Sequence, residues 1–350
     1  MLAQSRLRLE DTPTISLCIP ARNETHALED CLVAAVSSDY EKLEIIVLDD
    51  CSQDKTSDII RSFAQDGVRF VQGLAPGDEW LGKNNAYRTL AQEARGEYLV
   101  FVSVDTRLDP TTVTKLVGYM QDKKLSMVSV LPQRRDVWRA SVLWAPLRYF
   151  WQMVLPLGLN TPTATSLWAI RSDSLAEHGS FEVFKDKILL ENELAKMFFT
   201  HAEYRFLLAG GDLRVWYAKK WSSQVETAIR LWYPSLRKSL FQSAIAIVAH
   251  FLLFIFPIVG LVIGFIQSLV WVELIAFATL VVEAVLFFRY LSVTHKGLSS
   301  IVGVILLPLV ALQEIALIVI SVYQYKRGRV SWKGRNICYP KPARYKRTQL

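Results

Sequence analysis

The stretch IIVLDD at residues 45–50, followed by CSQDKT at residues 51–56, indicates the fold of the first half of this chain. Its apolar residues end abruptly at two adjacent acids, Asp49 and Asp50. A short apolar run that stops at a turn is typical of a strand buried on both faces of a parallel sheet. We therefore expect both acids at the carboxyl end of that strand, where open α/β sheets bind their ligands.

Two further apolar runs end in a similar way. Residues 14–19 lead into Pro20, Ala21, Arg22, Asn23 and Glu24, and residues 97–102 lead into Ser103, Val104, Asp105 and Thr106. Because the carboxyl ends of parallel strands meet at one edge of a sheet, the pattern predicts that Asp49, Asp50 and Asp105 converge there in one pocket.

Strand-like and helix-like patterns alternate through this half of the chain. Strands are expected at residues 14–19, 43–48, 68–72, 98–103 and 125–130, and helices near residues 25–36, 56–65, 83–94 and 110–122. Such alternation predicts βαβ units and an α/β fold with a mainly parallel sheet. Further strands are expected at residues 204–208 and 213–218, after a helix that buries one face around Leu194 and Phe198.

Together these stretches resemble the nucleotide-sugar domain of family 2 glycosyltransferases, which have the GT-A fold. The motifs that carry the resemblance are PARNE at residues 20–24, DDCSQDKT at 49–56, GKNNA at 82–86 and SVDT at 103–106. The match covers roughly residues 14–235, with WKGR at residues 332–335 as a further match. The chain is most similar to the membrane-bound subgroup of hopene-associated and carotenoid glycosyltransferases, which add sugars to lipids.

Residues 241–323 are almost entirely apolar, which predicts a membrane-embedded protein. Residues 241–288 contain Glu273 and Glu283 but no Lys or Arg, and a helix of that length would extend about 72 Å. Because the hydrocarbon core of a bilayer is about 30 Å thick, this stretch is long enough for two spans. Residues 301–323 are a third candidate.

The basic tail indicates on which side of the membrane the C-terminus lies. Residues 326–347 contain nine Lys or Arg and no acid, which predicts attraction to anionic lipids on the cytoplasmic face rather than binding of nucleic acid. Three crossings would leave this tail outside, so one apolar segment is expected to lie in the interface or to re-enter. Residues 241–256, halted by Pro257, are the preferred candidate, and residues 301–323, interrupted by Pro308, are the other. Residues 1–14 lack the apolar core of a signal peptide, so we expect the globular part in the cytoplasm.

Three segments are expected from these patterns. Residues 1–235 form the GT-A domain, residues 239–323 form transmembrane or interfacial helices, and residues 324–350 form the cytoplasmic tail. Interfacial helices are expected near residues 138–158 and 225–238, since aromatic and basic residues alternate there. An ordinary core helix is an equal alternative for residues 138–158.

The resemblance assigns the donor site residue by residue. It implies that Pro20 to Glu24 and the pair Asp49 and Asp50 line the nucleotide pocket; the alternative for the two acids is a turn with a helix cap. Gly82 and Lys83 open a helix whose N–H groups favour phosphate, although an exposed lysine is the alternative.

The metal and the general base follow from the same resemblance. Asp105 is expected to hold Mg²⁺ or Mn²⁺ together with the donor diphosphate. The chain departs from the family here, because Ser103 stands where the family has its first acid. It departs again at Glu191 and Asn192, where the family has an acid pair that supplies the base.

Because the neutral amide of Asn192 cannot accept a proton, three hypotheses remain. Glu191 or Glu193 acts as the base, or the acceptor is an anionic phosphate that needs none, or the protein is not catalytic. A surface ion pair between Glu193 and Lys196 is the alternative role for Glu193.

Four residues near the apolar segments resemble positions that border the diphosphate or the lipid acceptor: Arg230, Trp232, Trp332 and Arg335. Arg suits phosphate and Trp suits stacking on a sugar, and interfacial anchoring is the alternative. The sequence as a whole predicts a membrane-associated hexosyltransferase that moves a sugar from a UDP- or GDP-sugar to a polyprenyl phosphate or a hydroxyl lipid. A non-catalytic binding or scaffold protein derived from the same fold is the alternative.

Overall fold

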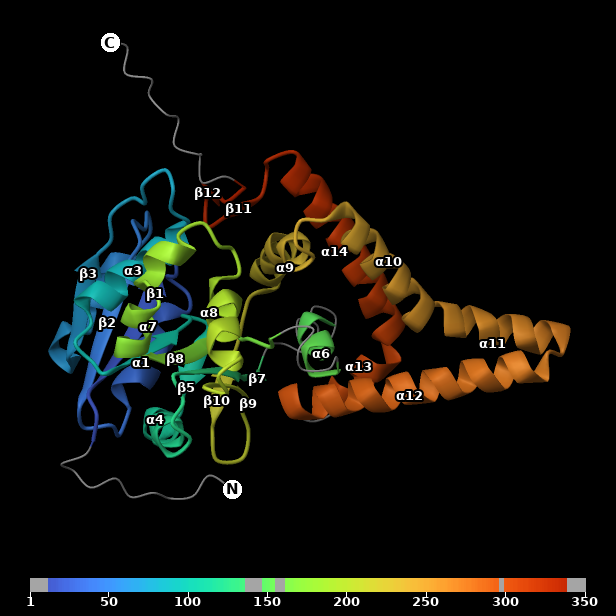
Figure 1. Ribbon diagram of the computed structural model, residues 1–350, viewed down its shortest axis with the longest axis horizontal. Coiled ribbons are helices and arrows are strands. Elements are labelled where there is room, and N and C mark those ends of the chain that lie inside the picture. The colour runs from blue at the N-terminus through green and yellow to red at the C-terminus, as the bar shows by residue number, and fades with distance from the viewer. Residues whose placement is uncertain (1–11, 136–146, 155–160, 296–298, 339–350) are drawn as a thin grey trace, which may run out of the picture. The chain divides into compact units, whose positions relative to one another are not determined.

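The computed structural model describes residues 12–135, 147–154, 161–295 and 299–338 (Figure 1). These residues form two compact units. The first, here called the sheet unit, takes its described residues from Met1–Gln133, Thr163–Tyr217 and Lys333–Leu350. The second, the helical unit, takes them from Arg134–Pro162 and Ala218–Trp332.

A seven-stranded sheet forms the centre of the sheet unit. In spatial order its strands are β3 (Val68–Gln72), β2 (Leu43–Asp49), β1 (Ile15–Ala21), β4 (Tyr98–Val102), β8 (Leu167–Arg171), β6 (Met127–Leu131) and β9 (Tyr204–Leu208). Strand β1 pairs in parallel with both β2 and β4. Strand β8 runs antiparallel to both of its neighbours. The α/β fold with a mainly parallel sheet is therefore confirmed.

Strand β8 is absent from the strands expected from the sequence. Leu167 to Ile170 are fully buried, so the strand is a short continuous apolar run with no alternation. Periodicity cannot distinguish such a run from a piece of buried helix.

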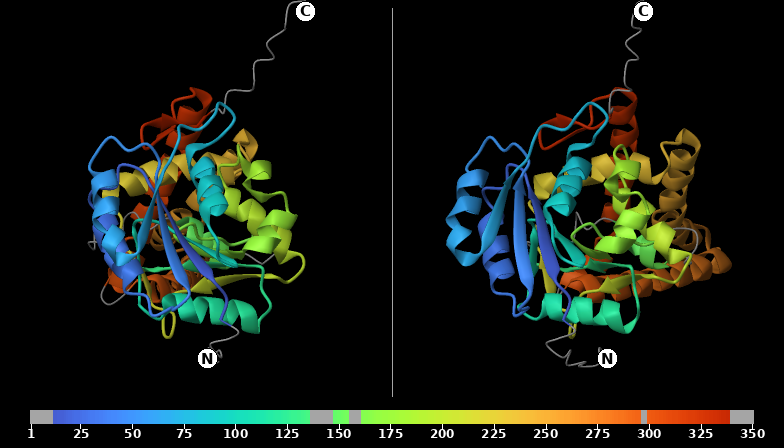
Figure 2. Two further views of the ribbon diagram at one scale, coloured as in Figure 1. Left: turned by 90° about the vertical axis from the view of Figure 1, so that its left-hand side faces the viewer. Right: turned by 60° about the vertical axis from the view of Figure 1, so that its left-hand side comes forward.

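Helices cover the two faces of this sheet with different kinds of side chain (Figure 2). One face packs against α1 (Leu28–Val36), α2 (Thr56–Ser62) and α4 (Thr112–Asp122), and most of its buried side chains are aliphatic. The other packs against α3 (Gly82–Glu93), α7 (Ser172–Glu177), η3 (Ser180–Phe184) and α8 (Leu190–Phe199). On this second face Phe101 stacks on Trp168 with ring centroids 4.3 Å apart.

Shorter elements complete the sheet unit. They are η2 (Ala64–Asp66), β5 (Thr106–Leu108), β7 (Gln133–Arg134), whose second residue belongs to the helical unit, β10 (Val215–Tyr217) and β12 (Arg335–Asn336). The strand expected at residues 213–218 is β10, which pairs with β5 in a separate small sheet.

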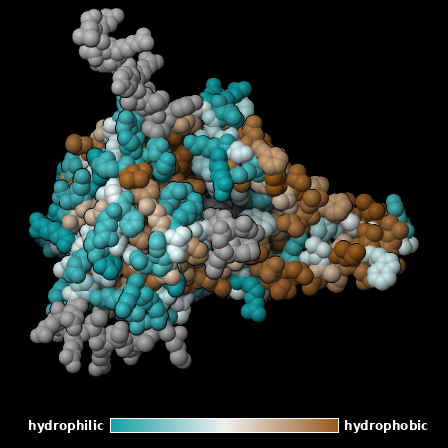
Figure 3. Space-filling view, in the orientation of Figure 1, coloured by the Kyte–Doolittle hydropathy of each residue, from teal (hydrophilic) through white to brown (hydrophobic). Residues whose placement is uncertain are grey.

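The helical unit consists of α6 (Leu147–Val154), α9 (Trp221–Ser235), α10 (Leu240–Phe254), α11 (Phe256–Gln267), α12 (Val270–Thr294), α13 (Ser299–Ile305), α14 (Leu307–Lys326) and β11 (Ser331–Trp332). Large apolar side chains are exposed over α10, α11 and α12 (Figure 3). Among the described residues, α12 and α14 are long and apolar enough to cross a membrane. A third span arises only if α9 and α10, which meet at 118°, count as one.

The apolar stretch at residues 241–288 is more divided than expected. Helix α10 ends at Phe254 and α11 begins at Phe256, because Pro257 is placed at the start of a helix where its missing N–H costs nothing. Neither α10 nor α11 alone is long enough for a span. Pro308 likewise stands at the start of α14. Of the interfacial helix expected near residues 138–158, α6 is described, and residues 136–146 and 155–160 lie outside the described residues.

Candidate donor-binding site

The acids predicted to meet do leave the sheet at one edge. Asp49 is the last residue of β2 and is paired with Ala21 of β1. Strand β4, which lies on the other side of β1, ends at Val102, immediately before Ser103 and Asp105. The loop after β1 therefore lies between the two acid-bearing loops, as parallel pairing requires.

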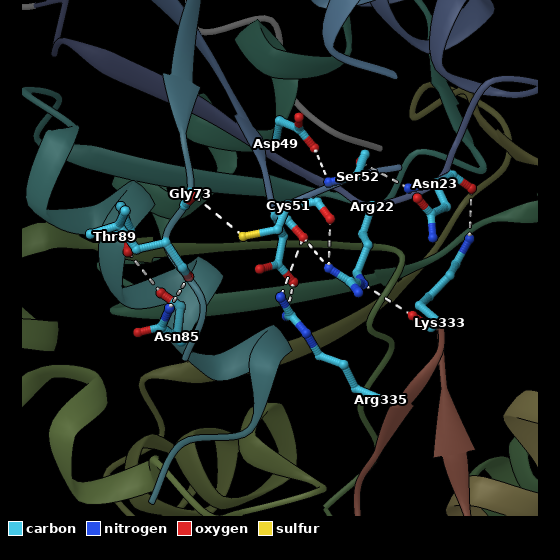
Figure 4. Close-up of polar contacts among 12 residues, drawn as sticks. Arg22, Asn23, Asp49, Cys51, Ser52, Gly73, Asn85, Thr89, Lys333 and Arg335 are labelled. Carbon is cyan, nitrogen blue, oxygen red and sulfur yellow. Dashed lines mark hydrogen bonds and ion pairs between the residues drawn. The ribbon is translucent and has the colours of Figure 1, made fainter. Parts of the chain in front are cut away.

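Side chains tie the loop after β1 to the loop after β2 (Figure 4). The Asn23 side-chain oxygen accepts a hydrogen bond from the Gln53 amide at 2.9 Å, and the Asn23 amide donates to the Ser52 hydroxyl at 3.0 Å. Asn23 and Cys51 both have positive φ angles, 51° and 55°. Non-glycine residues rarely adopt this conformation, so the contacts between the loops hold the backbone of both.

Asp49 performs the turn role that was the alternative to nucleotide binding. Its carboxylate accepts hydrogen bonds from the Ser52 amide at 3.0 Å and from the Ser57 hydroxyl. Asp54 accepts from the Thr56 amide at 3.0 Å at the start of α2. Partial burial disfavours its charge, but hydrogen bonds from Thr25 and Thr56 outweigh burial and lower the pKa of Asp54 to about 2.

Asp50 has a partner from the far end of the chain. The residue is 3% exposed, and its Oδ2 lies 2.5 Å from Nη1 of Arg335. Burial raises the pKa of Asp50 even though Arg335 and Arg22 act against the rise. The other oxygen, Oδ1, is buried and accepts no hydrogen bond from the residues that the structure describes.

Residues 333–335, here called the C-terminal strap, bind across both loops (Figure 4). The Lys333 ammonium is 2.8 Å from Oε1 of Glu24, and its carbonyl accepts from Nε of Arg22 at 3.0 Å. Arg22 also donates to the carbonyls of Asp50 and Cys51. Residues more than 280 positions apart in sequence thus share one network of charge.

Gly82 allows the strap to approach the start of α3. A Cβ at this position would lie 2.5 Å from Nη1 of Arg335, closer than side chains tolerate. The first residue of α3 is therefore in contact with the guanidinium group that pairs with Asp50.

Lys83 is paired with one of the candidate bases. Its ammonium contacts Oε1 of Glu191 and lies 5.1 Å from the ring centroid of Tyr87. The Tyr87 hydroxyl donates to the same oxygen at 3.1 Å. Burial opposes the charge of Glu191, which is 1% exposed, but Lys83 and Tyr87 outweigh it, so the pKa of Glu191 is lowered.

The neighbours of Glu191 differ in exposure. Asn192 is buried, and Glu193 forms the expected surface ion pair with Lys196 at 2.9 Å. That alternative reading of Glu193 is confirmed as a contact, and its role in catalysis stays a prediction.

Asp105 lies on a tight turn between β4 and β5. The Thr106 amide donates to the Ser103 carbonyl at 2.8 Å, and both Ser103 and Asp105 are partly exposed. Within the described residues no group of three or more His, Cys, Asp or Glu side chains could hold a metal ion. One carboxylate still fits a hard dication that takes its remaining oxygen ligands from a diphosphate and water.

The remaining candidates belong to the helical unit. The Arg230 guanidinium lies 4.9 Å from the ring centroid of Trp332, while the Arg230 carbonyl accepts from the Tyr325 hydroxyl at 2.7 Å. Trp232 is buried, and its indole N–H donates to Oε2 of Glu314 at 2.5 Å. Its ring packs against Leu317 and Ile318, so Trp232 contributes to the interior of this unit.

One residue, Tyr87, was missing from the sequence-based site, where it completes the Lys83–Glu191 pair. Lys333, part of the WKGR match, bridges Glu24 and Asn23. Tyr87 follows Lys83 by one helical turn, a spacing that places both on one face of α3 and that could have identified it.

The fold is GT-A-like, as comparison with a solved structure shows. The mannosyltransferase PcManGT from Pyrobaculum calidifontis, solved in complex with GDP-Man and Mn²⁺, matches with a TM-score of 0.53 at 18% sequence identity. The match covers 89% of this chain and 86% of that one. At this level of identity the likeness is one of fold.

Residues 16–179 match the family model described as Glycosyl transferase family 2, so the resemblance read from the motifs is confirmed. The probable glycosyltransferase YdaM of Bacillus subtilis (strain 168) is 33% identical over 128 residues, which are 35% of this chain and 30% of that protein. The 4,4'-diaponeurosporenoate glycosyltransferase of Staphylococcus haemolyticus (strain JCSC1435) is 28% identical over 174 residues, 49% of this chain and 43% of that protein. The chain thus covers less than half the length of either relative.

Proposed function

We propose that this protein is a membrane-associated glycosyltransferase that moves a sugar from a nucleoside-diphosphate donor, a UDP- or GDP-sugar, to a lipid acceptor. The observation that carries the proposal is the placement of Asp49, Asp50 and Asp105 at one edge of a GT-A-like sheet, on either side of the PARNE loop. Open α/β sheets bind ligands at this edge. The family match over residues 16–179 supports the same reading.

The proposal divides the chain into a GT-A domain over residues 1–235, apolar helices over residues 239–323 and a basic tail over residues 324–350. Carboxylates and amides of the two joined loops bind the base and ribose of the donor. The α3 N-terminus, which begins at Gly82, favours the diphosphate.

Asp105 would hold a divalent metal ion, on the turn in which the Thr106 amide donates to the Ser103 carbonyl. A bound Mg²⁺ or Mn²⁺ neutralises the charge that builds on the departing diphosphate. The Mn²⁺ of the mannosyltransferase from Pyrobaculum calidifontis supports this choice of ion class.

We further propose a phosphate-bearing lipid, such as a polyprenyl phosphate, as the acceptor. A general base must accept a proton, but the Glu191 carboxylate is held in its charged form by Lys83 and has a lowered pKa. Glu193 is paired on the surface, and Asn192 is an amide. An acceptor that is already anionic needs no base, and a hydroxyl lipid that uses Glu191 or Glu193 is the competing possibility.

The membrane part of the proposal places the sheet unit and the strap in the cytoplasm, at a surface rich in anionic lipids. Helices α12 and α14 support it, since two crossings return the chain to the side on which it started. Lys326 is the last residue of α14, and Arg327 and Arg329 follow it, as the positive-inside rule expects. Labelling of intact cells with an impermeant thiol reagent tests it: modification of Cys338 but not of Cys51 would place the tail outside.

The test of the activity is donor hydrolysis and metal-supported nucleotide binding by the purified full chain. Asp105→Ala should weaken Mn²⁺-supported binding of UDP or GDP by at least about 10- to 100-fold, the range typical for the loss of an outer-shell partner of a metal site. Asp109→Ala is the matched control, because Asp109 accepts from the Thr111 amide and hydroxyl at the start of α4. Equal binding by both variants, or no binding and no hydrolysis by the unchanged protein, would favour the non-catalytic scaffold instead.

A further inference from the structure

The C-terminal strap places the Arg335 guanidinium against the buried carboxylate of Asp50, at the edge of the sheet where the donor is proposed to bind. One oxygen of that carboxylate, Oδ1, remains without a hydrogen bond from the described residues. Asp50 Oδ2 is 2.5 Å from Nη1 of Arg335, while the second guanidinium nitrogen lies 3.5 Å from the Asp50 carbonyl. Oδ1 accepts nothing from the described residues, although it is buried. Buried oxygens are nearly always hydrogen-bonded in folded proteins, so Oδ1 is the natural position for a donor group of a ligand.

Contacts of the neighbouring Lys333 hold the strap in place, and Gly82 leaves room for the Arg335 guanidinium. Lys333 is bound to Glu24 and Asn23, and the Lys333 carbonyl is bound to Arg22. Gly82 offers no side chain where the guanidinium passes. A planar guanidinium held in this way can orient a carboxylate as well as neutralise it.

We infer that Arg335 is a positioning residue of the donor site, which holds the Asp50 carboxylate in place and directs its oxygen Oδ1 toward an N–H or O–H group of the donor nucleoside. This inference rests on the proposed function and departs from the sequence-based expectation for Arg335, which placed it at the diphosphate or the acceptor. It assigns the strap, which lies outside the matched segment of residues 16–179, to nucleoside recognition.

The charge balance around Asp50 determines what the loss of Arg335 does. The charged groups that act on Asp50 are Arg335 of the strap, Arg22 of the loop after β1 and Asp49 of β2. Without Arg335, burial and the neighbouring Asp49 charge raise the pKa of Asp50 further, with Arg22 alone to oppose them. A larger fraction of Asp50 is then protonated at neutral pH, and raising the pH restores the charge.

The experiment is a titration of the full-length protein with UDP and with GDP, each with Mn²⁺, across pH 6 to pH 9. Arg335→Met should weaken nucleotide binding by about 10- to 100-fold at the acidic end, the range of a hydrogen bond to a charged group, and should recover as the pH rises. Arg335→Lys should restore most of the affinity at pH 7. Lys196→Met, which removes a cation of the exposed pair with Glu193, should show no such pH dependence.

A double-mutant cycle removes the remaining ambiguity. In an Asp50→Asn background the acid is neutral at every pH, so Arg335→Met should lose its pH-dependent effect. A loss of affinity that is equal at all pH values, or that persists in the Asp50→Asn background, would overturn the inference and leave the proposed function standing. Failure of the unchanged protein to bind either nucleotide would overturn both.

Discussion

Two regions of the sheet unit shift the pKa of a buried acid in opposite directions. At the end of β2, Asp50 is 3% exposed and its pKa is raised, while on α8, Glu191 is 1% exposed and its pKa is lowered. Both face a cation from a distant segment, Arg335 and Lys83. Glu191 has the Tyr87 hydroxyl and a backbone hydrogen bond in addition, whereas Oδ1 of Asp50 accepts no hydrogen bond from the part of the chain that the structure describes. At Glu191 the charge of Lys83 and the hydrogen bonds together outweigh burial, whereas at Asp50 burial outweighs Arg335 and Arg22.

The difference separates two kinds of acid that sequence alone cannot tell apart. An acid whose hydrogen-bonding capacity is filled from within the fold contributes to stability. One that is buried with spare capacity costs stability and is the better candidate for binding a ligand.

The largest effect on stability is expected when Glu191 loses the ammonium group of Lys83. Lys83→Met leaves Glu191 charged and buried, which should lower the free energy of unfolding by about 3–5 kcal/mol. Lys196→Met is the matched control on the exposed pair with Glu193, with an expected loss of less than about 0.5 kcal/mol. Urea unfolding in detergent, followed by tryptophan fluorescence, measures both. Similar values for the two variants would mean that the Lys83 pair is no stronger than a surface pair.

The next prediction concerns the sign of the charge effect. The pKa of Glu191 is lowered in the folded state, so its contribution to stability is present above its unfolded pKa and is lost as the pH falls through the folded value. The pKa of Asp50 is raised, so its ionisation costs stability as the pH rises above the unfolded value. At pH 7, Glu191→Gln should therefore lower stability and Asp50→Asn should raise it, each by about 1 kcal/mol.

Unfolding midpoints of the two variants between pH 4 and pH 7 measure this. Their differences from the unchanged protein should shrink toward pH 4, where both carboxyls are closer to their protonated forms. If both substitutions changed the stability in the same direction at pH 7, Glu191 and Asp50 would not differ in the way proposed.

The edge of the sheet that carries Asp49, Asp50 and Asp105 could be predicted from sequence, because each strand and the acid that follows it are neighbours in the chain. Each apolar strand ends at its own acid, and parallel pairing brings such ends together, so Asp49, Asp50 and the Ser103–Asp105 turn were placed correctly at one edge. The start of α3 at Gly82 and the start of α8 next to Glu191 were also read correctly. Short local signals suffice when the fold itself supplies the long-range arrangement.

The cations that pair with Asp50 and Glu191 could not be predicted from sequence, because they lie far from these acids along the chain. Nothing near Asp50 in sequence points to Arg335, and nothing near Glu191 points to Lys83, 108 residues earlier. Strand β8 was missed for a related reason: it lies between β4 and β6, so its short run is buried and apolar throughout and shows no alternation. The use of Trp232 in the interior of the helical unit likewise depends on Glu314, a contact that no local pattern encodes.

The smallest effect is expected at Asn192, which lies beside Glu191 at a position where the resemblance predicts an acid. If the acceptor is a lipid phosphate, the nucleophile is already charged, and Asn192→Asp should leave the transfer rate unchanged or lower it. A new buried carboxylate next to Glu191 adds like charge, which the Lys83 ammonium already offsets for one acid. If the acceptor is instead a hydroxyl lipid, a restored base is worth about 10²- to 10⁴-fold. Rates with a polyprenyl phosphate and with a hydroxyl lipid, measured side by side for both proteins, decide between them. A large rise with the hydroxyl lipid would show that the reaction lacks a base, and the phosphate acceptor would have to be abandoned.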